Sequence, residues 1–249
     1  MKYLLRLSYV GTRLCGFQVQ PNGRTVQGEM CRAADMLFGA GSLVSGCSRT
    51  DSGVHALDYA ATLQTDSATV IPPEKLPSAL NTFLPDDISV HSACVVDDGY
   101  SVRRHTLGKE YMYVINTAKY PDPFCVGRIW HYGHGLDTDK MKSAAGAIIG
   151  RHDFSAVMAS GSDVTDTVRT VDRCDVIRQD DVIRIYVSAD GFLYNMVRII
   201  VGTLTEIGSG RRCPDEMAAI IDSRDRSSAG ITAPADGLYL HKVFLDNIK

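Results

Sequence analysis

Hydrophobic residues in this chain follow two different periods, and segments of the two kinds succeed one another without strict alternation. A period of two, in which every second side chain is apolar, is typical of a half-buried strand. Residues 2–9 show it, because Tyr3, Leu5, Leu7 and Tyr9 share one face. The same kind of pattern predicts strands at residues 2–9, 42–47, 54–64, 88–96, 110–116, 171–178, 182–189 and 238–245.

The helical period lies between these strands. Thr25 is a good N-cap for a helix with one apolar face, and Gly39 and Gly41 end that helix. Further helices are predicted at residues 74–84, 139–149, 192–207 and 215–221. Mixed strands and helices of this kind favour an α+β fold with mainly antiparallel sheets. Because the order of elements restarts near residues 104–108, we expect two α+β halves, 1–106 and 107–249.

Composition excludes several classes of protein. With 45% hydrophobic and 22% charged residues, the 249-residue chain is neither disordered, collagenous nor a coiled coil. No apolar run reaches the roughly 18 residues that a membrane-spanning helix needs, and the charges of Lys2 and Arg6 interrupt any apolar signal segment. The seven cysteines are scattered without a Cys-x-x-Cys pair. We therefore expect a soluble, cytoplasmic protein with reduced thiols and no membrane partner.

Charge by itself does not identify a partner. The net charge of −3 argues weakly against nucleic acid, but 18 of the 26 basic residues are arginine, the better residue for phosphate recognition. Acidic residues pair at 86–87, 97–98 and 180–181. A basic cleft on a mildly acidic molecule therefore stays possible, because only the local field acts on a bound strand.

Several common catalytic motifs are absent from the sequence. It has no phosphate-binding G-x-x-x-x-G-K-[ST] loop, no dinucleotide-binding G-x-G-x-x-G after a strand, no G-x-S-x-G elbow and no zinc-ligand spacing. The chemistry is therefore expected to proceed without a metal or a nucleotide cofactor.

The densest cluster of reactive residue types is the polar turn between two apolar strands, residues 48–53. One interpretation is a simple β-turn, in which Asp51 bonds the backbone and Gly53 supplies a positive φ. The other is that Asp51 is a nucleophile or base at the tip of a loop, with Arg49 and Thr50 supplying a counter-charge and donors. Local features alone leave both interpretations open.

Two further segments carry candidate residues. Tyr111 and Tyr113 share one strand face just after Arg103 and Arg104, so they are either core tyrosines or base-stacking rings beside phosphate contacts. Arg198 is the single charge in the middle of an apolar helix, and an arginine there is rarely buried without a partner. A buried carboxylate would satisfy it, and removing one partner of such a pair costs about 3–5 kcal/mol.

Two segments together are highly specific: Arg-Thr-Asp-Ser-Gly-Val-His-Ala at residues 49–56 and Met-Val-Arg at 196–198. In these motifs the chain resembles the tRNA pseudouridine synthase A family, and the resemblance runs from Tyr9 to Phe244. The sequence departs from the family pattern at Ser48 and Ser52, where Gly and Ala are usual, and at Val10, where Asp is usual. Corroborating matches lie at residues 9–11, 16–18, 25–27, 79–81, 84–85, 109–113, 152–154, 201–204, 233–234 and 237–240.

The resemblance implies a function. Family members isomerise uridine to pseudouridine at positions 38, 39 and 40 of the tRNA anticodon stem-loop, as homodimers without a cofactor. Their fold has two related α+β halves, with mainly antiparallel sheets flanked by helices and an RNA cleft between the halves. By position in the motifs, Asp51 corresponds to the catalytic nucleophile, Arg198 to its ion-pair partner, Arg49 to a residue that positions the flipped nucleotide, and Tyr111 to the ring that stacks on the target base.

The charge balance adds an expectation about the surface. A chain of net charge −3 can hold tRNA only where its basic residues converge. We expect acidic residues 86–87 and 180–181 to face away from that surface. Arg49 and Arg198 are expected to border it, together with several of four further arginines: Arg13, Arg24, Arg103 and Arg104.

Two rival functions remain at this point. One is a non-catalytic RNA-binding protein of the same fold, in which Asp51 is only a turn residue. The other is a hydrolase with a carboxylate nucleophile and no relation to RNA, but the phosphatase pattern D-x-D-x-[TV] is missing. The sequence therefore favours the synthase.

Overall fold

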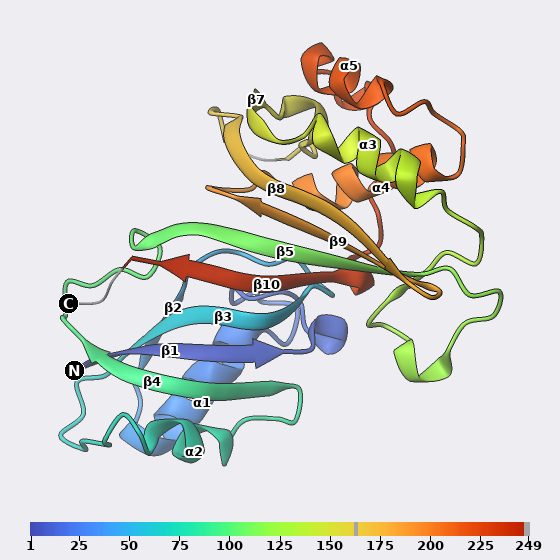
Figure 1. Cartoon of the computed structure of the whole chain (residues 1–249). Helices are drawn as coiled ribbons and strands as arrows, with labels where there is room; N and C mark the ends of the chain where they lie inside the picture. Colours follow the sequence, from blue (N-terminus) through green and yellow to red (C-terminus); the bar gives the residue numbers. More distant parts are fainter. Residues whose placement is uncertain (162–163, 247–249) are drawn as a thin grey trace. The chain divides into compact units, whose positions relative to one another are not determined.

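The computed structural model describes residues 1–161 and 164–246, and its elements are of the α+β class that the sequence predicts (Figure 1). The chain divides into two compact units. The first holds Met1–Leu107 and the chain from Tyr239 onward, and the second holds Gly108–Leu238. The boundary between the two units thus lies after residue 107, one residue beyond the expected position, and the last strand belongs to the first unit.

The strands of the first unit follow the order β4-β1-β3-β10. β1 (Lys2–Tyr9) is antiparallel to both β4 (Ile88–Val96) and β3 (His55–Gln64). β2 (Leu43–Gly46) is also antiparallel to β3, whereas β10 (Leu238–Leu245) runs parallel to it. A parallel neighbour needs a long crossover connection, and here the whole second unit lies between the two strands in the sequence.

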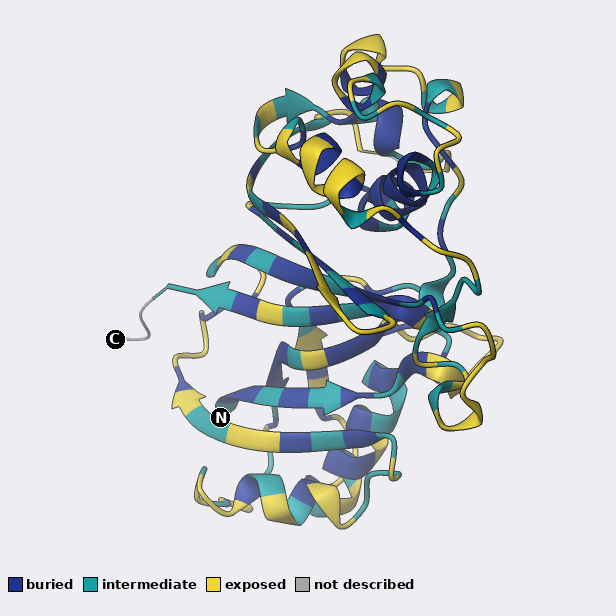
Figure 2. Cartoon of the chain, turned by 45° about the vertical axis from the view of Figure 1, so that its right-hand side comes forward, coloured by how far each residue is buried: buried dark blue, intermediate teal, exposed yellow. Residues whose placement is uncertain are grey.

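Two helices complete the first unit. α1 (Val26–Phe38) begins at Thr25, whose side chain accepts a hydrogen bond from the backbone N–H of Gly28, as the sequence predicts for an N-cap. α2 (Leu76–Asn81) packs against β4 and α1. The apolar face predicted for residues 2–9 is confirmed, since its four side chains are almost completely buried (Figure 2).

The strands of the second unit follow the order β5-β9-β8-β7, and each of these pairs is antiparallel. It is built from β5 (Thr106–Asn116), β9 (Val182–Ala189), β8 (Val168–Gln179) and β7 (Gly150–Asp153). The short strand β6 (Trp130–His131) adds to β5 in parallel. β8 and β9 form the hairpin that the sequence predicts around residues 179–181.

Three helices gather beside β7 and β8 in Figure 1: α3 (Thr138–Gly146), α4 (Met196–Gly208) and α5 (Glu216–Ser223). α4 is buried along its whole length except at Arg198 and Glu206. The described residues also form short 3-10 helices at Gly11–Arg13, Pro123–Cys125, Ser155–Val157, Arg226–Ser228 and Ala235–Gly237.

The predicted boundaries fail where a local conformation interrupts the pattern. The helix expected at 192–207 begins only at Met196, because Asn195 has a left-handed backbone with φ 58°. The helices expected at 74–84 and 139–149 are shorter than predicted, and β6 and β7 were not predicted at all. Both strands are too short to show a period.

Candidate active site

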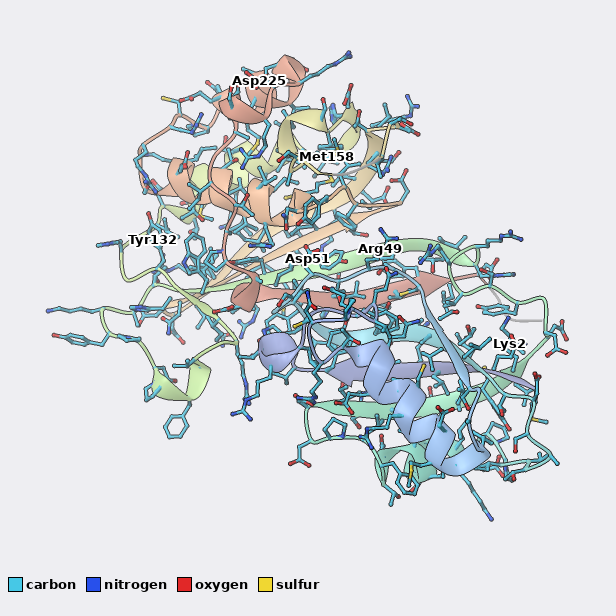
Figure 3. All side chains as sticks on the ribbon, turned by 180° about the vertical axis from the view of Figure 1, so that it is seen from behind. Lys2, Arg49, Asp51, Tyr132, Met158 and Asp225 are labelled. Carbon is cyan, nitrogen blue, oxygen red and sulfur yellow. The ribbon has the colours of Figure 1, made fainter. Side chains whose placement is uncertain are left out.

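Asp51 lies on the loop between β2 and β3, with Arg49 two residues before it (Figure 3). Asp51 is partly exposed and Arg49 is exposed, while Thr50 between them is buried. Gly53 has φ 82°, as the sequence predicts for this turn. The loop therefore presents alternate side chains outward while the residue between them anchors it.

A second loop, residues 10–17, holds the main chain of the Asp51 loop. Phe17 donates its N–H to the carbonyl oxygen of Thr50 over 3.2 Å. The carbonyl oxygen of Leu14 accepts from Gly53 N over 3.3 Å and from Ser52 Oγ over 3.3 Å. These bonds flank Asp51 on both sides, so its backbone position depends on residues more than 30 positions earlier.

Two glycines allow the two loops to approach this closely. A Cβ on Gly16 would lie 2.4 Å from the carbonyl oxygen of Thr50, and the backbone there has φ 81°. A Cβ on Gly11 would lie 2.0 Å from the carbonyl oxygen of Val54. Neither distance is sterically possible, and a positive φ favours glycine in addition. Gly11 also donates its N–H to Nδ1 of the buried His55 over 3.0 Å.

Aromatic side chains support the loop from the core of the first unit. Phe17 stacks on Tyr59 with 4.5 Å between ring centroids, and the Tyr59 hydroxyl donates to the carbonyl oxygen of Ser48. The hydroxyl groups of Tyr9 and Thr50 are 2.8 Å apart. A rigid loop with a partly exposed carboxylate is suited to nucleophilic or general acid–base chemistry.

The second unit carries Arg198 on α4. Its Nε donates to the carbonyl oxygen of Ala233 over 2.7 Å, and its Nη1 donates to Oδ1 of Asn195 over 2.8 Å. Ala233 N in turn donates to the carbonyl oxygen of Arg198 over 3.1 Å. Among the described residues, these two contacts occupy two of the five guanidinium N–H donors.

Tyr111 and Tyr113 lie on the same face of β5 but have different surroundings. Tyr111 is 8% exposed and contacts Phe192 edge to face, with 4.9 Å between centroids. Tyr113 is completely buried, and its hydroxyl donates to the carbonyl oxygen of Pro234 over 2.7 Å. Burial raises the pKa of Tyr113, so its hydroxyl stays protonated. Tyr113 is therefore a core residue, and Tyr111 is also buried but keeps a small exposed fraction.

One of the four further arginines is committed elsewhere. Arg24 pairs with Glu29 over 2.7 Å and with Asp87, and the hydrogen bond to Asp87 raises the pKa of Arg24. Asp87 thus pairs with one of the arginines proposed for RNA contact, and its carboxylate stabilises a half-buried guanidinium. The side chains of the other three are exposed: Arg13, Arg103 and Arg104.

The structure thus brings Arg49 and Asp51 together on one loop and places Tyr111 and Arg198 in the second unit. Sequence analysis missed the residues that support the Asp51 loop and the side chains of Tyr111 and Arg198. These are above all Tyr9, His55, Phe192 and Asn195. His55 and Asn195 stand inside or beside the two specific motifs, but no local pattern shows which group each one contacts. Within residues 1–161 and 164–246, no helix is long and apolar enough to cross a bilayer, and no three His, Cys, Asp or Glu residues gather where they could hold a metal ion.

Comparison with known proteins identifies the family. A protein of Thermoanaerobacter sp. (strain X514) named tRNA pseudouridine synthase A is 46% identical over 240 residues, which are 96% of this chain and 98% of that protein. The protein of the same name from Bacillus subtilis (strain 168) is 41% identical over 249 residues, covering 99% of this chain and 100% of the relative. This chain belongs to the tRNA pseudouridine synthase A family. The family model described as tRNA pseudouridine synthase also matches residues 144–246, a stretch that includes Arg198.

Proposed function

We propose that this chain isomerises uridine to pseudouridine at positions 38, 39 and 40 of the tRNA anticodon stem-loop, with Asp51 as the reacting carboxylate and without a cofactor. The observation that carries the proposal is the loop around Asp51, whose backbone is hydrogen-bonded on both sides of a partly exposed carboxylate. The chain also belongs to a family whose relatives are named tRNA pseudouridine synthase A, which supports the isomerisation of uridine in tRNA.

The reaction is a rearrangement within one nucleotide. The bond between N1 of uracil and C1′ of the ribose breaks, the base rotates, and a bond forms between C5 and C1′. A proton leaves C5 and N1 gains one, so no atom is added overall. Asp51 can take part by attacking C6 of the base, by attacking C1′ of the sugar, or by moving the proton. All three roles need a carboxylate held at a defined position, which the bonds from Phe17 and to Leu14 supply.

The target base must leave its stack before any of these steps. This costs a few kcal/mol, and less in a loop than in a duplex. In the proposal Tyr111 stacks on the flipped base, Arg49 holds the nucleotide, and Arg198 forms an ion pair with Asp51. The edge contact from Phe192 fixes the plane of the Tyr111 ring, and the two acceptors around Arg198 fix its guanidinium.

The test is pseudouridine formation on bulk tRNA, measured by tritium release from C5-labelled uridine. The parent protein is expected to be active at positions 38–40, and Asp51→Asn is expected to abolish turnover while the fold and the tRNA affinity remain. Asp97→Asn is the matched control, because Asp97 is an exposed acid in the same unit and its loss changes the net charge equally. Turnover of Asp51→Asn within tenfold of the control would make Asp51 a turn residue.

The proposal also includes the partners. A homodimer is expected, and light scattering of the purified protein measures it directly. The exposed Arg13, Arg103 and Arg104 are proposed to contact tRNA phosphates. The logarithm of tRNA affinity should then fall linearly with the logarithm of salt concentration, by about 0.7–0.9 per phosphate contacted. Replacing one of these arginines should reduce the slope by about 0.7–0.9, the contribution of one phosphate contact. Replacing Arg24 should instead lower the free energy of unfolding, because Arg24 pairs with Glu29 and Asp87.

A further inference from the structure

Asn195 has an unusual position at the start of α4. Its backbone is left-handed, with φ 58° and ψ 12°, and it is one of three residues other than glycine with a positive φ in the described chain. An N-cap residue normally has an extended backbone, and its side chain accepts from the first turn of the helix. The Asn195 side chain makes no such capping bond. Its conformation therefore serves something other than the helix end.

The carboxamide of Asn195 is directed at Arg198. Oδ1 accepts from Arg198 Nη1 over 2.8 Å, while Arg198 Nε donates to the carbonyl oxygen of Ala233 over 2.7 Å. The guanidinium is planar, so two acceptors on different nitrogens define both its position and its plane. Asparagine combines tolerance of a left-handed backbone with a neutral acceptor. Glycine would supply only the first property.

We propose that Asn195 is a positioning residue, which uses its left-handed backbone to set the direction of the Arg198 guanidinium in the active site. This rests on the proposed function, in which Arg198 pairs with the reacting carboxylate. Without the Asn195 acceptor, one of the two fixed points is lost, and the long arginine side chain samples other rotamers. The fraction of protein with a productive guanidinium then falls, so the effect appears in kcat rather than in tRNA binding.

The experiment separates the side chain of Asn195 from its backbone. Asn195→Gly keeps the left-handed conformation and removes only the acceptor. We expect kcat for pseudouridine formation to fall about tenfold, the size of one charge-assisted hydrogen bond, with KM for tRNA within about twofold of the parent and the protein still folded at the assay temperature. Asp180→Gly is the matched control, because Asp180 also has a positive φ (53°) and lies exposed in the turn between β8 and β9. It should leave kcat unchanged.

A double-mutant cycle shows whether Asn195 acts through Arg198. In an Arg198→Met background, Asn195→Gly should cause no further loss of kcat. An equal loss in both backgrounds, or a kcat equal to that of Asp180→Gly, would overturn the proposal.

A readout independent of activity keeps the two proposals distinguishable. The heteronuclear NOE of the Arg198 Nε–H, assigned from its absence in Arg198→Met, should fall in Asn195→Gly because the side chain becomes mobile. If the parent protein forms no pseudouridine, the proposed function fails, and an unchanged NOE would separately refute the contribution of Asn195 to the placement of Arg198.

Discussion

Gly16 sets the distance between the loop 10–17 and the Asp51 loop, so Gly16→Ala should displace the carboxylate of Asp51. The added Cβ would lie 2.4 Å from the carbonyl oxygen of Thr50, and contacts below 3.0 Å essentially never occur. The loops must therefore separate by about 0.6 Å, which lengthens the 3.2 Å bond from Phe17 N to Thr50 O beyond hydrogen-bond range. The left-handed backbone costs about 1–2 kcal/mol with a Cβ, and the lost bond adds about 1 kcal/mol.

Gly39→Ala is the matched control for this change. Gly39 also has a positive φ, 85°, but nothing lies within 4 Å of its added Cβ. Urea denaturation should show a loss of about 1–3 kcal/mol for the control, whose φ of 85° and ψ of 168° lie in a region that glycine almost alone adopts, and about 2–3 kcal/mol for Gly16→Ala. Because a displacement of about 1 Å can cost a factor of about 100 in rate, we expect kcat of Gly16→Ala to fall at least about tenfold below that of Gly39→Ala. Equal kcat values for the two variants, both fully folded, would refute the claim that this contact positions Asp51.

The remaining predictions concern single side chains. Tyr111→Leu should lower kcat/KM far more than Tyr111→Phe, since stacking on a base is worth about 1–3 kcal/mol; full activity in both variants would make Tyr111 a core residue. Tyr9→Phe removes the hydroxyl that lies 2.8 Å from Thr50 Oγ1, so the free energy of unfolding in urea should fall by about 1 kcal/mol. The kcat of this variant should also be lower than that of the parent. A hydrogen bond from Thr167 holds the pKa of Asp153 below its ordinary value, so this stabilisation is present above the unfolded pKa of about 4 and is lost as the pH falls through the lower folded pKa. Asp153→Ala should accordingly lose about 1.5–3 kcal/mol at pH 7 and progressively less in denaturation curves recorded below about pH 4; a loss that does not change with pH would exclude the ionised carboxylate as the cause.

Local patterns were sufficient for much of the fold. The strands predicted at residues 2–9, 88–96, 182–189 and 238–245 coincide with β1, β4, β9 and β10. Alternation of side chains is a property of the strand itself, so it can be read without knowing the neighbours. The N-cap Thr25 and the positive φ of Gly53 are equally local. The sequence motifs also singled out Asp51 and Arg198 as the residues to examine.

The partners of those residues are a different matter, because a hydrogen bond joins whatever groups the fold brings together. Arg24 illustrates this: its sequence context suggested an RNA contact, and the fold pairs it with Asp87, 63 positions away. In the same way, an arginine in an apolar helix signals by itself that it needs acceptors, since burying its charge unpaired is too costly. The tertiary structure supplies one acceptor from the carbonyl oxygen of Ala233, 35 positions further on. The other, Asn195 Oδ1, is only three positions away, but no local pattern shows the left-handed backbone from which it bonds Arg198. The sequence alone determined which residue types are present to react or to bind RNA. The direction of the Arg198 guanidinium depends on acceptors that lie within 3 Å of it only in the folded protein.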